Sequence, residues 1–140
     1  EKGNLIHEIM KHISCSNDID PALNHFLDNG NINKTQREEI NRIILSIINH
    51  PEIKEFYTSN ILSYNEREII VKDGKNLIPD RIVIPKKNTA IIIDYKTGDF
   101  NNYHIKQLND YQNALKKMGY SVVKKILVYI KENSIEVQKC

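Results

Sequence analysis

The chain has 140 residues, which is enough for one domain and leaves little room for a second, so we expect a single domain over residues 1–140. Hydrophobic residues make up 40% and charged residues 27%, proportions that are typical of a folded protein and that disfavour a disordered segment. The net charge of +2 favours polyanionic partners only weakly and does not by itself identify a nucleic-acid-binding protein.

The N-terminal part is predicted to begin with two helices. Apolar residues recur at helical spacing and predict an amphipathic helix over about residues 3–14. Asp20-Pro21 suits the start of a second helix, because proline is tolerated in the first turn. Asn29-Gly30 suits the end of that helix.

Two further helices are predicted before any strand. Thr35 and Glu38 form a capping-box pattern ahead of a row of isoleucines, which predicts a helix over about residues 35–49. Pro51 can open a short fourth helix that ends near Tyr57.

The chain then changes to strand-forming composition. Residues 61–72 are rich in isoleucine, valine and tyrosine, and Asp73-Gly74 is a turn signal. Residues 77–84 and 89–96 read as two further strands, so the three segments predict a three-stranded meander.

The C-terminal part is predicted to contain a helix and two strands. Residues 102–118 form the helix, with Gly119 as its cap, and residues 121–130 and 134–138 form the strands. The order of helices, three strands, a helix and two strands predicts an α/β fold. We expect a mixed central sheet of about five strands flanked by helices, an N-terminal helical segment, and a parallel strand pair in the sheet centre.

Several classes of protein are disfavoured by what the sequence lacks. Cys15 and Cys140 are far apart, so we expect no disulfide and no zinc site, and two cysteines exclude a four-cysteine iron–sulfur cluster within this chain. Apolar runs of about five residues are too short to span a membrane. We therefore expect a cytoplasmic protein with no membrane contact.

No GxxxxGK[ST] loop is present, so we expect no ATP site. The chain opens on Glu1 without a methionine, which suggests a piece of a longer polypeptide.

Charged residues stand at the end of the predicted strand 89–96. Side chains alternate across a strand, so Asp94 and Lys96 share a face with Ala90 and Ile92. Burying charge is costly unless the charge is paired or bound to metal. One interpretation is a functional site; the other is an ion pair at the point where the strand reaches water.

Asp80 favours the functional interpretation. It follows Pro79 inside the preceding apolar strand, and it can approach Asp94 if the two strands are antiparallel neighbours. Two adjacent carboxylates repel each other unless a cation lies between them or one is protonated. Oxygen ligands suit Mg²⁺ or Mn²⁺. The alternative is a solvated acid near a turn.

Glu66, Glu68 and His7 are weaker candidates. Glu66 and Glu68 share a face one strand earlier, and Glu68 is preferred because it lies closer to an apolar stretch. For Glu66 an exposed acid paired with a lysine or arginine is the favoured interpretation. A lone helical histidine such as His7 is more often a packed or surface residue than a metal ligand.

The helix over residues 102–118 carries polar residues on one face. Gln107 and Tyr111 are four residues apart, so they point the same way, toward phosphates or into partial burial. Lys106 adds positive charge that would favour a phosphate backbone without reading sequence, although by itself it could be part of a solvated face.

Together these residues resemble the PD-(D/E)xK nuclease signature, with Pro79-Asp80 followed by Asp94-Tyr95-Lys96. Flanking motifs occur in the order and with the rough spacing of the RecB-type branch, which forms the C-terminal nuclease domain of bacterial UvrD/Rep-like helicase–nucleases. The resemblance covers Gly3 to about Tyr129 and rests on Gly3-Asn-Leu-Ile-His7, Glu68, Pro79-Asp80-Arg81, Ile93-Asp-Tyr-Lys-Thr-Gly98 and Gln107-Leu-Asn-Asp-Tyr111.

The resemblance implies a restriction-endonuclease-like core and roles for individual residues. It makes Asp80, Asp94, His7 and the backbone carbonyl of Tyr95 ligands of Mg²⁺ or Mn²⁺. It makes Lys96 the catalytic lysine. One branch of the family carries a cysteine-held iron–sulfur cluster, and this chain departs from that branch because it has only two cysteines.

The remaining matched positions are an acidic residue beside the metal and the residues that face the DNA. Glu68 matches the acidic position, with Glu66 as the fallback because the local alignment is ambiguous. Gln107 and Tyr111 match the QxxxY motif on the DNA-binding side, and Lys106 lies next to them.

The resemblance implies a metal-dependent DNA nuclease, with an exonuclease domain of a recombinational-repair helicase–nuclease as the expected setting. The implied partners are the DNA backbone, the helicase domains of the same parent chain, and a partner subunit. Two alternatives stay open: a catalytically inert DNA-binding or scaffolding module of such a complex, and a stand-alone restriction or junction-cutting endonuclease.

Overall fold

The computed structural model describes residues 2–71, 74 and 76–140. Its helices are α1 (Lys2–Met10), α2 (Ile19–Asp28), α3 (Lys34–Ile48) and α4 (Asn102–Lys117), with 3-10 segments η1 (Ser16–Asp18) and η2 (Lys54–Tyr57). Its strands are β1 (Leu62–Asn65), β2 (Ile69–Ile70), β3 (Asn76–Leu77), β4 (Arg81–Ile84), β5 (Thr89–Thr97), β6 (Ser121–Ile130) and β7 (Ile135–Lys139). None of the helices in the described part of the chain is both long and apolar enough to cross a membrane.

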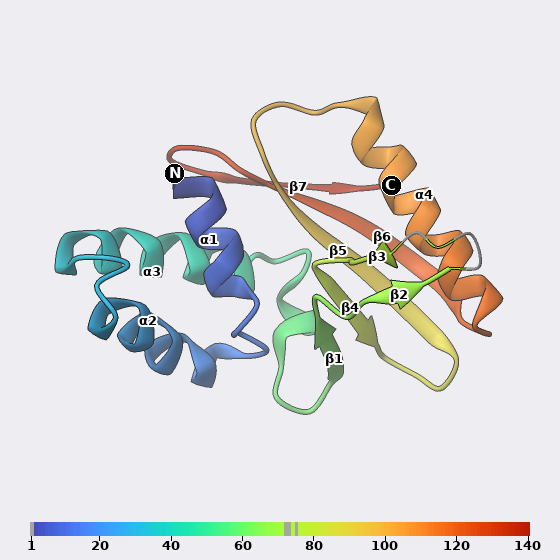
Figure 1. Ribbon diagram of the computed structural model, residues 1–140, viewed down its shortest axis with the longest axis horizontal. Coiled ribbons are helices and arrows are strands. Elements are labelled where there is room, and N and C mark those ends of the chain that lie inside the picture. The colour runs from blue at the N-terminus through green and yellow to red at the C-terminus, as the bar shows by residue number, and fades with distance from the viewer. Residues whose placement is uncertain (1, 72–73, 75) are drawn as a thin grey trace.

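The sheet confirms the expected α/β fold. Five strands lie in the order β1-β4-β5-β6-β7, and β2 and β3 form a separate two-stranded sheet. Strands β5 and β6 are parallel, whereas the other neighbours in the five-stranded sheet are antiparallel. Helix α4 makes the connection that a parallel pair requires, and the predicted parallel pair is therefore confirmed at the centre of the sheet (Figure 1).

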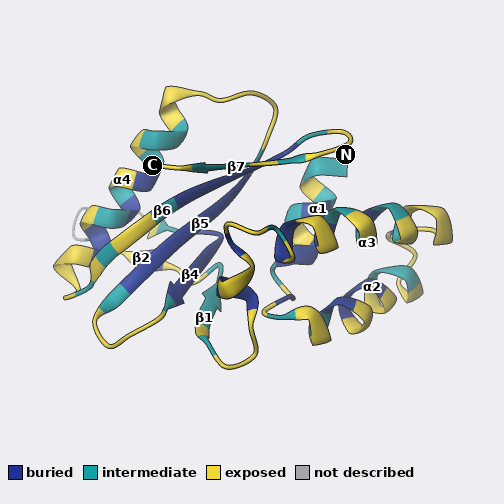
Figure 2. Cartoon of the chain, turned by 180° about the vertical axis from the view of Figure 1, so that it is seen from behind, coloured by how far each residue is buried: buried dark blue, intermediate teal, exposed yellow. Residues whose placement is uncertain are grey.

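Helices cover both faces of this sheet. Helices α1 and α3 pack on one face, with α2 against them, and α4 packs on the other face (Figure 1). Because side chains alternate along a strand, β5 supplies both cores: Ile91, Ile93 and Tyr95 face the N-terminal helices, and Ala90 and Ile92 face α4. Figure 2 shows that β5 is buried along most of its length and that the C-terminal half of β6 is buried beside it.

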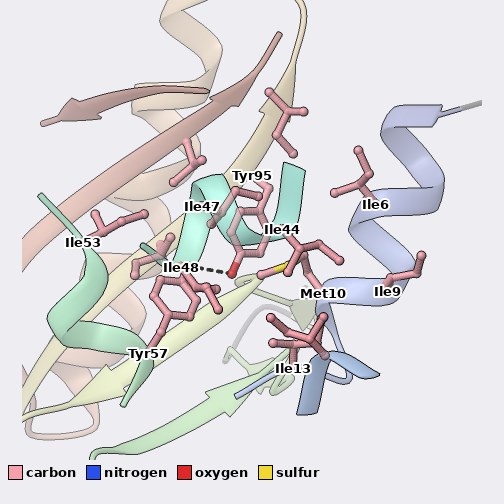
Figure 3. Close-up of a cluster of buried hydrophobic side chains, with 14 of the residues drawn as sticks. Ile6, Ile9, Met10, Ile13, Ile44, Ile47, Ile48, Ile53, Tyr57 and Tyr95 are labelled. Carbon is pink, nitrogen blue, oxygen red and sulfur yellow. Dashed lines mark hydrogen bonds between the residues drawn. The ribbon is translucent and has the colours of Figure 1, made fainter. Parts of the chain in front are cut away.

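The larger core contains a buried polar contact among aliphatic side chains. Ile6 and Ile9 of α1 and Ile44 of α3 are fully buried there. The hydroxyl groups of Tyr57 and Tyr95 are 2.8 Å apart and hydrogen-bonded, so two phenols buried in this core satisfy each other (Figure 3).

Two helix boundaries differ from prediction. Helix α1 ends at Met10 rather than near residue 14, because the next amides, beginning with that of His12, bond three residues back and tighten the chain into a turn. Ile13 is nevertheless fully buried, so the apolar spacing continues past the end of the helix.

The capping box of α3 lies two residues before the predicted one. Asn33 Oδ1 accepts a hydrogen bond from the Gln36 amide, and Gln36 Oε1 accepts one from the Asn33 amide, each at 2.8 Å. Asparagine is a better N-cap than threonine, which explains why the helix starts earlier. The second helix and the short helix ending at Tyr57 agree with prediction to within about three residues, although the latter is a 3-10 segment.

The predicted strand 61–72 is interrupted. Glu66 has a φ of 52°, in the left-handed region that breaks a strand, so β1 ends at Asn65 and β2 pairs with β3 outside the main sheet. The predicted strand 77–84 is also divided, into β3 and β4. Asp73 of the predicted Asp73-Gly74 turn lies outside the described residues.

Prediction is accurate in the C-terminal half. Strands β5, β6 and β7 and helix α4 begin and end within two residues of the predicted bounds. Gly119 has a φ of 96°, which fits its predicted role after the helix, because glycine adopts this conformation without steric cost.

Candidate active site

The antiparallel pairing of β4 with β5 brings Asp80 and Asp94 together. Arg81 pairs with Ile93, so Asp80, one residue before β4, lies opposite Asp94. The Asp80 amide donates to Asp94 Oδ1, and the Tyr95 amide donates to Asp80 Oδ2, each at 2.8 Å. The expectation that antiparallel neighbours bring the two carboxylates together is confirmed, and both residues are buried.

Alternation along β5 gives its last residues different environments. Tyr95 is buried with the N-terminal helices. Lys96 lies toward α4, where its ammonium group donates to Gln107 Oε1 and lies 3.5 Å from Asp94 Oδ2. Asp94 and Lys96 therefore share a face and interact directly, as the alternation predicts.

His7 reaches the carboxylates from a different element. Helix α1 places His7 Nε2 2.6 Å from Asp80 Oδ1. The contact lacks the angles of a hydrogen bond, and Nε2 is a buried atom without a hydrogen-bond partner among the described residues. The close Asp80 carboxylate raises the pKa of His7, against the lowering effect of burial.

The charged form of Asp94 is disfavoured at the buried pair. Burial, followed by the charge of Asp80, raises the pKa of Asp94 to about 7, and Lys96 offsets only part of this effect. A further cation beside Asp94 would stabilise its ionised carboxylate. Strongly perturbed pKa values also cluster at functional sites.

The two polar residues predicted on α4 lie beside the site, and Lys106 does not. Gln107 bonds to Lys96, and the Tyr111 hydroxyl donates to the carbonyl of Ile78 at 3.4 Å. Lys106 is exposed and pairs with Asp110 one turn further along the helix. Its proposed contact with DNA stays a prediction.

The structure places Glu66, rather than the preferred Glu68, next to Asp80. The Glu66 amide donates to the Asp80 carbonyl at 2.9 Å, and its carboxylate lies 3.2 Å from the Lys11 ammonium group. Glu68 is exposed, and no hydrogen bond or ion pair between described residues involves it. The left-handed Glu66 is the physical reason, because the break in the strand ends the regular alternation before Glu68.

Sequence reasoning missed the structural role of Arg81. Its side chain is fully buried and donates to Asn65 Oδ1 at 2.9 Å and to three backbone carbonyls. Those carbonyls belong to Ile13, Ser14 and Phe56. Its guanidinium group also lies 4.3 Å from the centre of the Tyr57 ring. Arg81 thus ties the segment after α1 to β4, next to the candidate metal ligand Asp80. A charged residue inside a buried strand was the signal that could have indicated this role.

The residues present fit a divalent cation in part. His7 Nε2 lies 2.6 Å from Asp80 Oδ1, and Asp94 adds a second carboxylate. In this conformation, however, the Asp94 oxygens face the Asp80 amide and Lys96. Among the described side chains no three histidine, cysteine or acidic groups are spaced as a complete metal cluster. Coordination by all three therefore requires a side-chain movement of Asp94.

Comparisons with known proteins add little to this geometry. No family model and no curated protein matches the chain. Among solved structures, the crystal structure of SSO0001 aligns with 96% of this chain at 21% identity and a TM-score of 0.38. The match covers 65% of that structure's chain. A TM-score this low supports no argument about the function of the present chain.

Proposed function

We propose that this chain is a metal-dependent DNA nuclease domain of the PD-(D/E)xK type, RecB branch, that hydrolyses phosphodiester bonds. The observation that carries the proposal is the convergence of Asp80, Asp94 and Lys96 at one end of β4 and β5, with His7 brought in from α1. Two buried carboxylates held beside a lysine and a histidine are costly for folding, which favours a functional explanation.

The cation would be held by His7, Asp80 and Asp94, with the Tyr95 carbonyl as a further candidate ligand. When bound, Mg²⁺ or Mn²⁺ supplies an activated water and neutralises charge on the phosphate. The protein prepares the ligands through its backbone, since the amides of Asp80 and Tyr95 orient one oxygen of each carboxylate. Prepositioned ligands lower the cost of reorganisation during the reaction.

Lys96 is suited to stabilise the charge that develops on the phosphate. Its ammonium group lies between Asp94 and Gln107, and its side chain is only 18% exposed. A fixed positive charge in a place poorly accessible to water interacts with an oxyanion more strongly than a solvated lysine does. Gln107 is the positioning residue in this arrangement, because it accepts from Lys96.

The biological setting follows from the sequence resemblance and belongs to the proposal. We expect an exonuclease that contacts the DNA backbone without sequence preference, linked to helicase domains in a longer parent chain and to a partner subunit. Strong salt dependence of DNA binding would accompany such backbone recognition.

Cleavage of end-labelled linear DNA in Mg²⁺ or Mn²⁺ tests the proposal. We expect Asp80→Asn, Asp94→Asn and Lys96→Ala each to lower the cleavage rate by about a hundredfold or more, the loss typical of removing one preorganised electrostatic group. Asp28→Asn, at an exposed acid in α2, is the matched control and should leave the rate unchanged. Metal-independent DNA binding without cleavage by the wild type would support an inert binding module instead.

A further inference from the structure

One residue near the carboxylates, His104, is not used in the proposed chemistry, although it shares a hollow with residues that are. A hollow of about 230 Å³ opens where the start of α1, the end of β5 and the first turn of α4 meet. Its lining consists of Gly3, Asn4, His7, Tyr95, Lys96, Thr97, His104 and Ile130.

The lining of the hollow favours an anion. Among the described residues that line it, none is acidic, although Asp80 and Asp94 are close by. Its polar side chains belong to Lys96, two histidines, Asn4 and Thr97. Hydrogen-bond donors without a carboxylate among them are suited to phosphate oxygens, which only accept.

His104 is held in place within this lining. Its Nδ1 lies 2.8 Å from the hydroxyl of Tyr129, a residue that is 2% exposed. Burial raises the pKa of Tyr129, so the phenol keeps its proton and can donate it to Nδ1. Burial and the charge of Lys96 lower the pKa of His104, so the ring is neutral at neutral pH. In the tautomer whose Nδ1 accepts from Tyr129, Nε2 carries the N–H, and no contact with Tyr129 occupies it.

We infer that this hollow is a phosphate-binding subsite in which the Nε2–H of His104 contacts a DNA phosphate other than the one that is cleaved. His104 and Gln107 are three residues apart on α4, so one helix face serves both the subsite and Lys96. That the phosphate belongs to DNA rests on the proposed function. It is either an internal phosphodiester next to the cleaved bond or the terminal phosphate of a strand end.

Three substitutions of His104 separate a phosphate contact from a structural role. His104→Asn keeps a polar atom near the position of Nδ1, so the contact with Tyr129 is retained. His104→Gln instead keeps a hydrogen-bond donor near the position of Nε2. We expect His104→Ala and His104→Asn to weaken binding of a fluorescein-labelled DNA duplex about tenfold, as expected for losing one hydrogen bond to a charged group. His104→Gln should bind nearly as well as the wild type. His25→Ala, at an exposed histidine of α2, is the matched control.

Binding is measured by fluorescence anisotropy with Ca²⁺ in place of Mg²⁺, so the result does not depend on cleavage. Equal weakening by His104→Asn and His104→Gln would indicate a packing role and overturn the subsite. Unchanged binding by all three variants would overturn it as well, even if the wild type cleaves DNA normally. A wild type that binds through His104 but does not cleave would overturn the nuclease proposal and leave the subsite in place.

Chemical changes in the DNA identify the phosphate. A neutral methylphosphonate is placed at one internal linkage at a time, and a second series compares ends with and without a terminal phosphate. At one of these positions, the change in the DNA should weaken binding by the wild type. The same change should not weaken binding by His104→Ala any further, because both changes remove the same contact. An internal position indicates a phosphodiester, and an end position indicates a terminal phosphate. Purely additive losses at every position would contradict the inference.

Discussion

The amide of Asp80 donates to the carboxylate of Asp94 across the β4–β5 pair, at 2.8 Å. The carboxylate of Asp80 in turn accepts from the amide of the residue after Asp94, so backbone groups hold both acids close to each other. The register of the two strands holds the carboxylates together despite their repulsion. The negative charge of Asp94 stays unfavourable, as its raised pKa indicates.

Removing the negative charge of Asp94 should stabilise the metal-free protein. The pKa of Asp94 is raised from 3.8 to about 7 in the folded state, so its ionisation destabilises the fold progressively as pH rises through this window. At pH 8 in EDTA, Asp94→Asn should increase the free energy of unfolding by at least about 1 kcal/mol. Urea denaturation measures the change, with Asp28→Asn as control. A destabilised Asp94→Asn would show that the carboxylate contributes to folding and is not a cost.

Arg81 should be essential for stability although it does not touch the candidate ligands through its side chain. Arg81→Met leaves buried carbonyl acceptors without a donor, and we expect a loss of about 3 kcal/mol in urea denaturation. Arg42→Met, at an exposed position of α3, should change stability by less than about 0.5 kcal/mol. A similarly small effect of Arg81→Met would mean that the hydrogen bonds of the guanidinium group add little.

Gln107 should affect the rate of cleavage more than the binding of DNA, because its contact is with Lys96. Gln107→Leu removes the acceptor and should lower kcat about tenfold with little change in KM, the pattern of a lost interaction in the transition state. Gln107→Glu keeps an acceptor oxygen and should retain more activity than the leucine variant. Gln138→Leu, in β7, serves as control. An increase in KM alone would place Gln107 in DNA binding instead.

The buried tyrosine pair should make the fold sensitive to alkali. Burial raises the pKa of Tyr57 from 10.0 to about 12. A raised folded-state pKa gives stability that is complete below the unfolded value of 10.0 and is lost as pH rises toward 12. The free energy of unfolding, measured between about pH 9 and pH 11.5, should therefore fall above pH 10, and Tyr57→Phe should show a shallower fall. Identical curves would mean that Tyr57 is not among the groups responsible.

The part of the site that lies on β4 and β5 could be predicted because it depends on side-chain alternation and on the pairing of neighbouring strands. Alternation along 89–96 placed Asp94 and Lys96 on one face, and antiparallel pairing with the preceding segment placed Asp80 opposite Asp94. These relationships need only the strand period and the order of neighbouring strands. The helical spacing of Gln107 likewise predicted its position beside the site.

Other features depend on contacts between distant parts of the chain. The left-handed Glu66 divides a segment whose composition predicted a continuous strand, and this brings the Glu66 amide to the Asp80 carbonyl, while its carboxylate pairs with Lys11 as expected for that residue. Three partners of Arg81 are backbone carbonyls of two separate segments, one at Ile13 and Ser14 and one at Phe56, which no side-chain pattern reveals. His104 carried a weaker signal, its spacing of three from Gln107, but its partner Tyr129 lies on another strand.

Binding of Mn²⁺ tests most directly whether Asp80, Asp94 and His7 share one cation. Electron paramagnetic resonance reports free Mn²⁺, so a titration measures how many ions the protein removes from solution. We expect saturable binding by the wild type and by Asp28→Asn, and at least about tenfold weaker binding by Asp80→Asn, Asp94→Asn and His7→Ala, because removing one ligand or its support costs that much affinity or more. Wild-type binding that all three substitutions leave unchanged would contradict the account.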